Sequence, residues 1–135
     1  MASIYDDIRA ALEVHLSQVV GIPEIAHENV SYSPTTGTPF VQPKLLPLSR
    51  RSAVRGLNPQ QRYDGLFRVF CYVPEGNGPS AADNLANLVI DAFDAATDIT
   101  LGGTRVSIDY AERESGFVDS PWYYVPVNIK YYIYA

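Results

Sequence analysis

Two stretches of the chain repeat hydrophobic residues every three or four positions, which predicts two amphipathic helices. The first covers residues 3–20, where Ser3 can cap the first turn and Gly21 followed by Pro23 ends the helix. The second covers residues 80–96 and follows a glycine-rich turn. The positions expected to face the core are Ile4, Ile8, Ala11, Leu12, Leu16 and Val19 in the first helix and Ala82, Leu85, Ala86, Val89 and Phe93 in the second.

Alternating side chains predict strands over residues 65–74, 105–111 and 122–134. The first of these is apolar on both faces, which is typical of a central strand. Weaker alternation predicts a short strand over residues 26–32, and the prolines within residues 39–48 predict an edge or interrupted strand. Residues 49–63 have no clear period and are expected to form a long loop or flexible arm, and residues 112–121 a polar connection.

This order of elements predicts an α+β fold. We expect a mainly antiparallel sheet of about four to five strands, with two helices packed on one face and a long basic loop at residues 49–63. The 135 residues are enough for one hydrophobic core, so a single domain over residues 1–135 is expected.

Composition excludes several classes of protein. One cysteine rules out a disulfide framework within the chain, and one cysteine with two histidines leaves too few ligands for a structural zinc site. A net charge of −5 argues against non-specific nucleic-acid binding by the whole molecule. No apolar run approaches the ~20 residues of a membrane span, and the first ten residues do not resemble a secretory signal, so the cytosol is the expected compartment.

Candidate catalytic groups are few, and each has a structural interpretation. Cys71 lies in line with Phe67, Val69 and Val73, which favours core packing over a nucleophile. His15 lies at the edge of the first helix's apolar face, as expected of a half-buried structural histidine, and His27 has no partner visible in the sequence. The glycine-rich turn at residues 76–80 precedes a helix but lacks both phosphate-binding motifs, so a tight turn explains it. No acid–base pair has suitable spacing, so we expect no catalysis.

Charge is strongly segregated along the chain. Residues 29–63 contain no acid and hold half of the ten basic residues, namely Lys44, Arg50, Arg51, Arg55 and Arg62. Two interpretations are open: a solvated loop attracted to its own acidic domain, or a basic arm that docks on another subunit or on a tube. The last strand adds Tyr123, Tyr124, Tyr131, Tyr132 and Tyr134, which suit either sheet packing or an interface. A nucleic-acid-binding module, with tyrosines stacking on bases and arginines holding phosphates, is a weaker alternative.

Three stretches in a fixed order carry a resemblance to a known family. They are HENVSYSPTTGTPFVQPKLLP, then RYDGLFRVFCYVPEGNGPSAADNLANLVIDAF, then the final strand WYYVPVNIKYY. The recurring positions are Arg62, Gly65, Val69, Pro74, Gly76 and Gly78, followed by Trp122, Tyr123, Pro126, Val127, Ile129 and Tyr131. In this order and spacing, the chain resembles the tail terminator family of long-tailed bacteriophages over nearly its full length.

The resemblance implies a structural virion protein without enzymatic activity or cofactor. It implies a ring of identical copies, expected to be a hexamer, that caps the tail tube, ends tail polymerisation and presents a joining surface to the head. The implied partners are other copies of the chain, the tail tube protein and head-completion or connector proteins, with no stable nucleic-acid binding and no membrane. The implied location is the head-proximal end of the virion tail, after assembly in the host cytoplasm. Another head–tail joining or tail-completion protein is the alternative.

Overall fold

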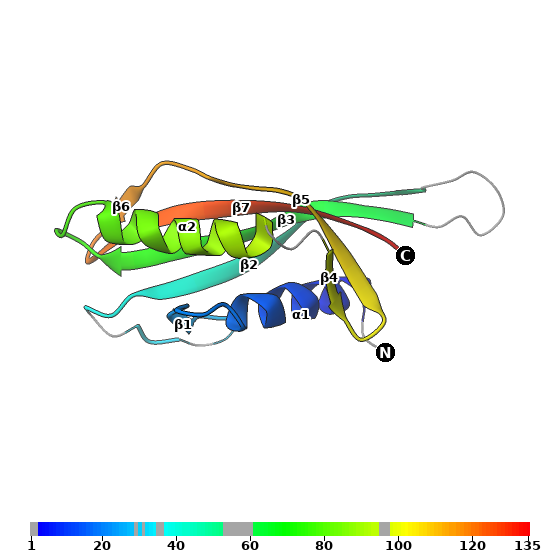
Figure 1. Ribbon diagram of the computed structural model, residues 1–135, viewed down its shortest axis with the longest axis horizontal. Coiled ribbons are helices and arrows are strands. Elements are labelled where there is room, and N and C mark those ends of the chain that lie inside the picture. The colour runs from blue at the N-terminus through cyan, green and yellow to red at the C-terminus, as the bar shows by residue number, and fades with distance from the viewer. Residues whose placement is uncertain (1–2, 29, 31, 35–36, 53–60, 95–97) are drawn as a thin grey trace.

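One curled sheet of seven strands organises the structure, a computed structural model that describes residues 3–28, 30, 32–34, 37–52, 61–94 and 98–135 (Figure 1). The strands follow the order β1-β2-β3-β7-β5-β4, and β6 also pairs with β7. The elements are α1 (Ile4–Ser17), β1 (Glu24–Ile25), β2 (Phe40–Ser52), β3 (Gln61–Pro74), α2 (Ser80–Asp94), β4 (Asp98–Leu101), β5 (Thr104–Arg113), β6 (Phe117–Asp119) and β7 (Trp122–Tyr134).

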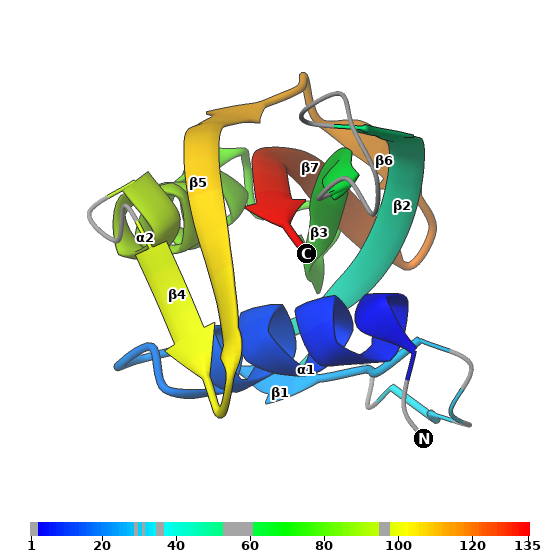
Figure 2. The same cartoon turned by 90° about the vertical axis from the view of Figure 1, so that its right-hand side faces the viewer.

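The predicted fold class is wrong in the size and kind of its sheet. The sheet has seven strands instead of four to five, and it is mixed because β1 runs parallel to β2. It also curls into a half-barrel, and Figure 2 shows α1 lying across the open side of that curl. The extra strands β1, β4 and β6 contain only two to four residues each, which is too short to show a period in the sequence.

The pairing of β3 with β7 forms the centre of the sheet. Their antiparallel register runs without interruption from Arg62 opposite Tyr134 to Pro74 opposite Trp122. Both strands alternate in phase, so one face buries the large side chains of Phe67, Ile129 and Tyr131. The predicted inward row of β3 is confirmed, since Phe67, Val69, Cys71 and Val73 are all buried.

Both helices pack against this buried face. Ser3 and Asp6 form a capping box at the start of α1, as the predicted cap at Ser3 requires. The apolar stripe of α2 contacts β7, β5 and β3, with Val89 and Phe93 fully buried. In the first turn of α2 the carboxylate of Asp83 pairs with Arg113 of β5. Within the described parts of the chain, no helix covers the opposite face of the sheet.

The predicted long loop is wrong at both of its ends. Strand β2 continues to Ser52, and β3 begins at Gln61, so Arg50 and Arg51 lie on a hairpin arm opposite Tyr63 and Arg62. Residues 53–60, which include Arg55, lie outside the described residues. Apart from Tyr63, which is buried, the described side chains of the arm are exposed or half-exposed, and for this reason the hydrophobic pattern did not reveal it.

Beyond Val41, β2 has β3 on one side and no strand on the other among the described residues. At residues 43, 45 and 47 the backbone polar groups point to that open side. Val41, two residues earlier, shows the same orientation, because its carbonyl oxygen accepts a hydrogen bond from the N–H of Ala26. Two of the three are prolines, which have no N–H to offer. The third, Leu45, donates its N–H to Glu28 Oε1 at 3.1 Å. This edge therefore exposes no free donor between residues 43 and 47.

Gly65 is required where β3 passes over Tyr131. A Cβ at position 65 would lie 2.7 Å from the carbonyl oxygen of Leu46 and would overlap the phenol of Tyr131. We therefore expect Gly65→Ala to lower the free energy of unfolding by about 1–3 kcal/mol, as overpacking does. Chemical denaturation measures this, with Gly103→Ala as the control because a Cβ there meets no atom within 4 Å. Equal stability of the two variants would contradict the packing described.

Candidate functional site

Three basic side chains on the helix-free face of the sheet surround one carboxylate, that of Asp64. Arg62 Nε lies 2.8 Å from Asp64 Oδ1, while Lys130 Nζ and Arg51 Nη2 lie 3.5 and 3.9 Å from Oδ2. Pairing across β2, β3 and β7 places these residues side by side at the base of the hairpin arm. We call Arg51, Arg62, Asp64 and Lys130 the Asp64 cluster. Three positive charges around one negative charge give this surface an excess that suits an anionic partner.

Two tyrosines of β7 hold Arg62 against the sheet. Its guanidinium carbon lies 4.5 Å from the ring centroid of Tyr132 and 5.6 Å from that of Tyr134. Its Nη1 also donates a hydrogen bond of 2.9 Å to the Tyr134 hydroxyl. These contacts and the bond to Asp64 fix the direction of the guanidinium, and the hydrogen bonds raise the pKa of Arg62 further.

The pKa of Asp64 lies below its ordinary value. Burial of the carboxylate pushes the pKa upward, but the hydrogen bond from Arg62 and the charge of Lys130 outweigh this effect. The carboxylate is therefore ionised across the physiological range. It is the counter-charge that allows the three cations to lie together.

The predicted docking residues fall into two groups. Arg51 and Arg62 meet in the Asp64 cluster, in keeping with the interpretation in which the arm is attracted to its own domain. Lys44 and Arg50 are exposed, and no carboxylate of the described residues lies within ion-pair distance of either. The guanidinium carbon of Arg50 lies 5.7 Å from the ring centroid of Tyr63, and Lys44 lies farther along β2 opposite Arg68.

Sequence reasoning missed the roles of Lys130 and Asp64. Neither belongs to the acid-free segment that drew attention, and they approach one another only because β3 and β7 pair in one register. The alternation of Lys130 with Tyr132 and Tyr134 was a usable signal, since it puts these three residues on one face of the last strand.

A row of aromatic rings crosses the same face at the other end of the sheet. Phe40 stacks on Tyr72 with centroids 4.6 Å apart, Tyr72 contacts Tyr124 at 5.0 Å, and Phe117 follows at 5.4 Å. The row spans four strands, β2, β3, β7 and β6, and Phe117 at its end is 45% exposed. The tyrosines of the last strand therefore pack across the sheet and also contribute to its surface.

The candidate catalytic groups have structural environments. Cys71 is fully buried, and burial raises the pKa of its thiol to about 12, so it is not a thiolate nucleophile. His15 Nε2 lies 2.9 Å from the carbonyl oxygen of Ala92, and its ring packs edge-on against Phe93. His27 has a partner that the sequence did not reveal, because its Nδ1 lies 3.3 Å from Oε1 of Glu13.

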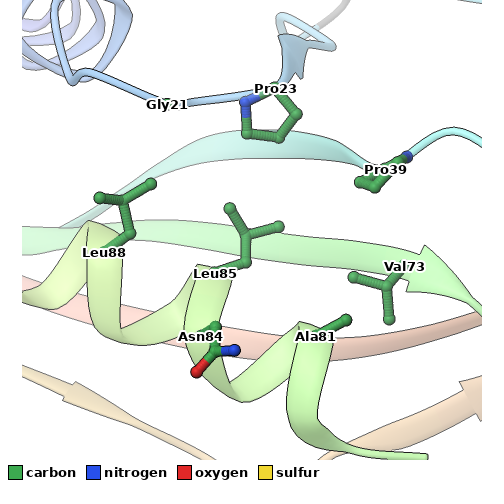
Figure 3. A pocket seen from close by; sticks show the side chains of 8 residues that line it. All are labelled: Gly21, Pro23, Pro39, Val73, Ala81, Asn84, Leu85 and Leu88. Carbon is green, nitrogen blue, oxygen red and sulfur yellow. The ribbon is translucent and has the colours of Figure 1, made fainter. Parts of the chain in front are cut away.

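A groove of about 290 Å³ lies between α2, the connection from α1 to β1, and the adjoining ends of β2 and β3 (Figure 3). Leu85 and Leu88 of α2 point from one wall towards Pro23 and Pro39 on the other. All the lining residues are uncharged: Gly21, Pro23, Pro39, Val73, Ala81, Asn84, Leu85 and Leu88. The groove is thus a mainly apolar surface feature, at the end of the β2–β3 hairpin away from the arm.

No metal or membrane feature emerges from the part of the chain that the structure describes. Those residues contain no group of three or more His, Cys, Asp or Glu side chains arranged to hold a metal ion. Neither described helix combines the length and the apolar character needed to cross a bilayer.

Comparison with known proteins gives a family match over most of the chain. A family model described as phage tail terminator protein matches residues 7–131. Among solved structures 21 chains match. One of them superposes with a TM-score of 0.73 at 21% sequence identity, covering 96% of this chain and 94% of that chain, which establishes a shared fold. No curated protein matches the chain.

The Asp64 cluster predicts a specific dependence of stability on pH. We expect Asp64→Asn to lower the free energy of unfolding by about 1–2 kcal/mol at pH 7, because three cations lose their counter-charge. The folded-state pKa lies below the usual 3.8, so the wild-type advantage is complete above that value and is lost as the pH falls through the lowered pKa. Urea denaturation from pH 7 to pH 2 measures the difference.

Asp109→Asn is the matched control, since Asp109 is exposed and forms no ion pair within the described residues. A constant difference between wild type and Asp64→Asn down to pH 2 would contradict the assignment of the effect to the carboxylate charge.

Proposed function

The chain belongs to the phage tail terminator family, and we propose that it caps the tail tube of a long-tailed phage and ends tube polymerisation. Membership of this family makes it a structural protein of the phage tail. The proposed capping role rests on a difference in character between the two ends of the sheet. One end of the sheet carries an excess of positive charge on a projecting hairpin, and the other end carries aromatic rings and an apolar groove.

The observation that carries the proposal is the uncompensated charge of the arm. Arg50 on the arm has no acidic partner in the described residues, nor has Lys44 farther along β2, and the Asp64 cluster holds three cations against one carboxylate. The chain as a whole is acidic, with a net charge of −5, so a second copy is itself an anionic partner. Opposite potentials of this kind steer two copies together and fix their register.

We further propose that identical copies form a ring at the end of the tube, with six as the expected number. Arg50, Arg51, Arg55, Arg62 and Lys44 are the proposed docking residues towards a neighbouring copy or the last ring of tube protein. A head-to-tail contact between unlike surfaces closes into a ring when its rotation permits. In this proposal the free face of the ring meets the head-completion or connector proteins, which places the protein at the head-proximal end of the tail after assembly in the host cytoplasm.

Deleting the gene distinguishes tail termination from another role in joining head and tail. We expect particles made without this protein to contain tubes of uncontrolled length, because nothing stops the addition of tube protein. Negative-stain electron microscopy of tail lengths measures the result, and expression of the protein from a plasmid is the control. Tails of uniform length that stay unattached to filled heads would instead identify a joining factor and overturn the proposal.

Charge reversal on the arm tests the docking residues separately. We expect an Arg50/Arg51/Arg55→Glu variant to cap terminator-free tubes at least tenfold less well than wild type, since its arm now repels an acidic partner. Co-sedimentation with purified tubes measures capping. The control is Arg105→Glu, which reverses an exposed arginine on the β4–β5 hairpin. Undiminished capping by a folded triple variant would exclude the arm as the docking element.

A further inference from the structure

We infer that the apolar groove beside α2 receives the base of the hairpin arm from a second copy of the chain, an inference that rests on the proposed ring. The groove and the arm lie at opposite ends of one hairpin, as Figure 1 shows for α2 and the projecting ends of β2 and β3. Val73 lines the groove, and Arg62 lies eleven residues back along the same strand, about 36 Å away at ~3.3 Å per residue. The arm of one copy therefore reaches only the groove of another.

The apolar parts of the two surfaces are complementary. Leu48 lies at the bulge of β2, next to the arm cations, and is 60% exposed. The groove offers Leu85, Leu88 and the two prolines as an uncharged lining. Its volume of about 290 Å³ lies at the lower limit of small-molecule pockets and is suited to one or two aliphatic side chains.

The charged parts of the two surfaces are complementary as well. Asp91 follows Asn84 by seven residues and Leu88 by three, so it continues the stripe of α2 that forms one wall of the groove. Asp91 is exposed, and no basic side chain of the described residues pairs with it. An apolar groove with an acid at its rim thus faces an exposed leucine that is followed two residues later by the exposed Arg50.

Such a contact joins two unlike surfaces and is repeated by every copy. Each subunit gives an arm to one neighbour and accepts an arm from another, which is the arrangement that a ring requires. The burial of Leu48 would contribute affinity, and the charge pairs would determine register and exclude wrong partners.

Reversing both sides of one charge pair tests the inference. We expect Arg50→Glu and Asp91→Arg each to weaken ring formation on terminator-free tubes about tenfold or more. The combined Arg50→Glu/Asp91→Arg chain should recover most of the loss, because the pair is restored with opposite sign. Asp109→Arg is the control, since it reverses an exposed acid on β5.

Ala81→Trp, which fills the groove from an exposed position, should also prevent ring formation.

The readouts are the fraction of capped tube ends in electron micrographs and the thermal unfolding midpoint, which confirms that each variant is folded. If Arg50→Glu impairs capping while Asp91→Arg and Ala81→Trp do not, the arm contacts the tube and the inference is wrong, although the proposed function stands. A doubly reversed chain no better than the weaker single variant would also overturn it. Wild-type protein that fails to cap tubes would overturn the proposed function itself.

Discussion

The uninterrupted pairing of β3 with β7 determines the arrangement of the rest of the molecule. With Arg62 opposite Tyr134 and Pro74 opposite Trp122, both strands keep their alternation in phase over their whole length. A shift of one residue would exchange the buried row for the row that carries Asp64 and Lys130. The same register therefore builds the hydrophobic core on one face and brings the Asp64 cluster and the aromatic row together on the other.

The sequence was informative where a single element carried its own pattern. The last strand has the predicted bounds, and α1, α2 and the inward row of β3 follow the hydrophobic period closely. Prediction failed where an element depends on its partners. β1 and β6 are held by two or three backbone pairs, and residues 49–52 and 61–63 form strands without an apolar alternation to announce them. Apart from the buried Tyr63, the described side chains of those segments are exposed or half-exposed, so they leave no hydrophobic period.

The candidate site was predictable in its charge and not in its geometry. Segregation of basic residues between positions 29 and 63 drew attention to the arm. It did not show that Arg51 and Arg62 share the carboxylate of Asp64 while Lys44 does not. That distinction needs the cross-strand neighbours, because Asp64 and Lys130 come from outside the segment. The groove beside α2 combines four segments of the chain, so no local motif could have indicated it.

The prolines at positions 43 and 47 and the bond from Leu45 to Glu28 matter beyond the stability of β2. An outer strand with free donors is a template on which a further strand can grow, and growth of that kind has no natural end. Here three successive outward positions of β2, residues 43, 45 and 47, offer no free N–H group. A second molecule therefore finds no backbone donor at these positions with which to extend the sheet, so a contact along this part of the border has to be made by side chains, which define its geometry.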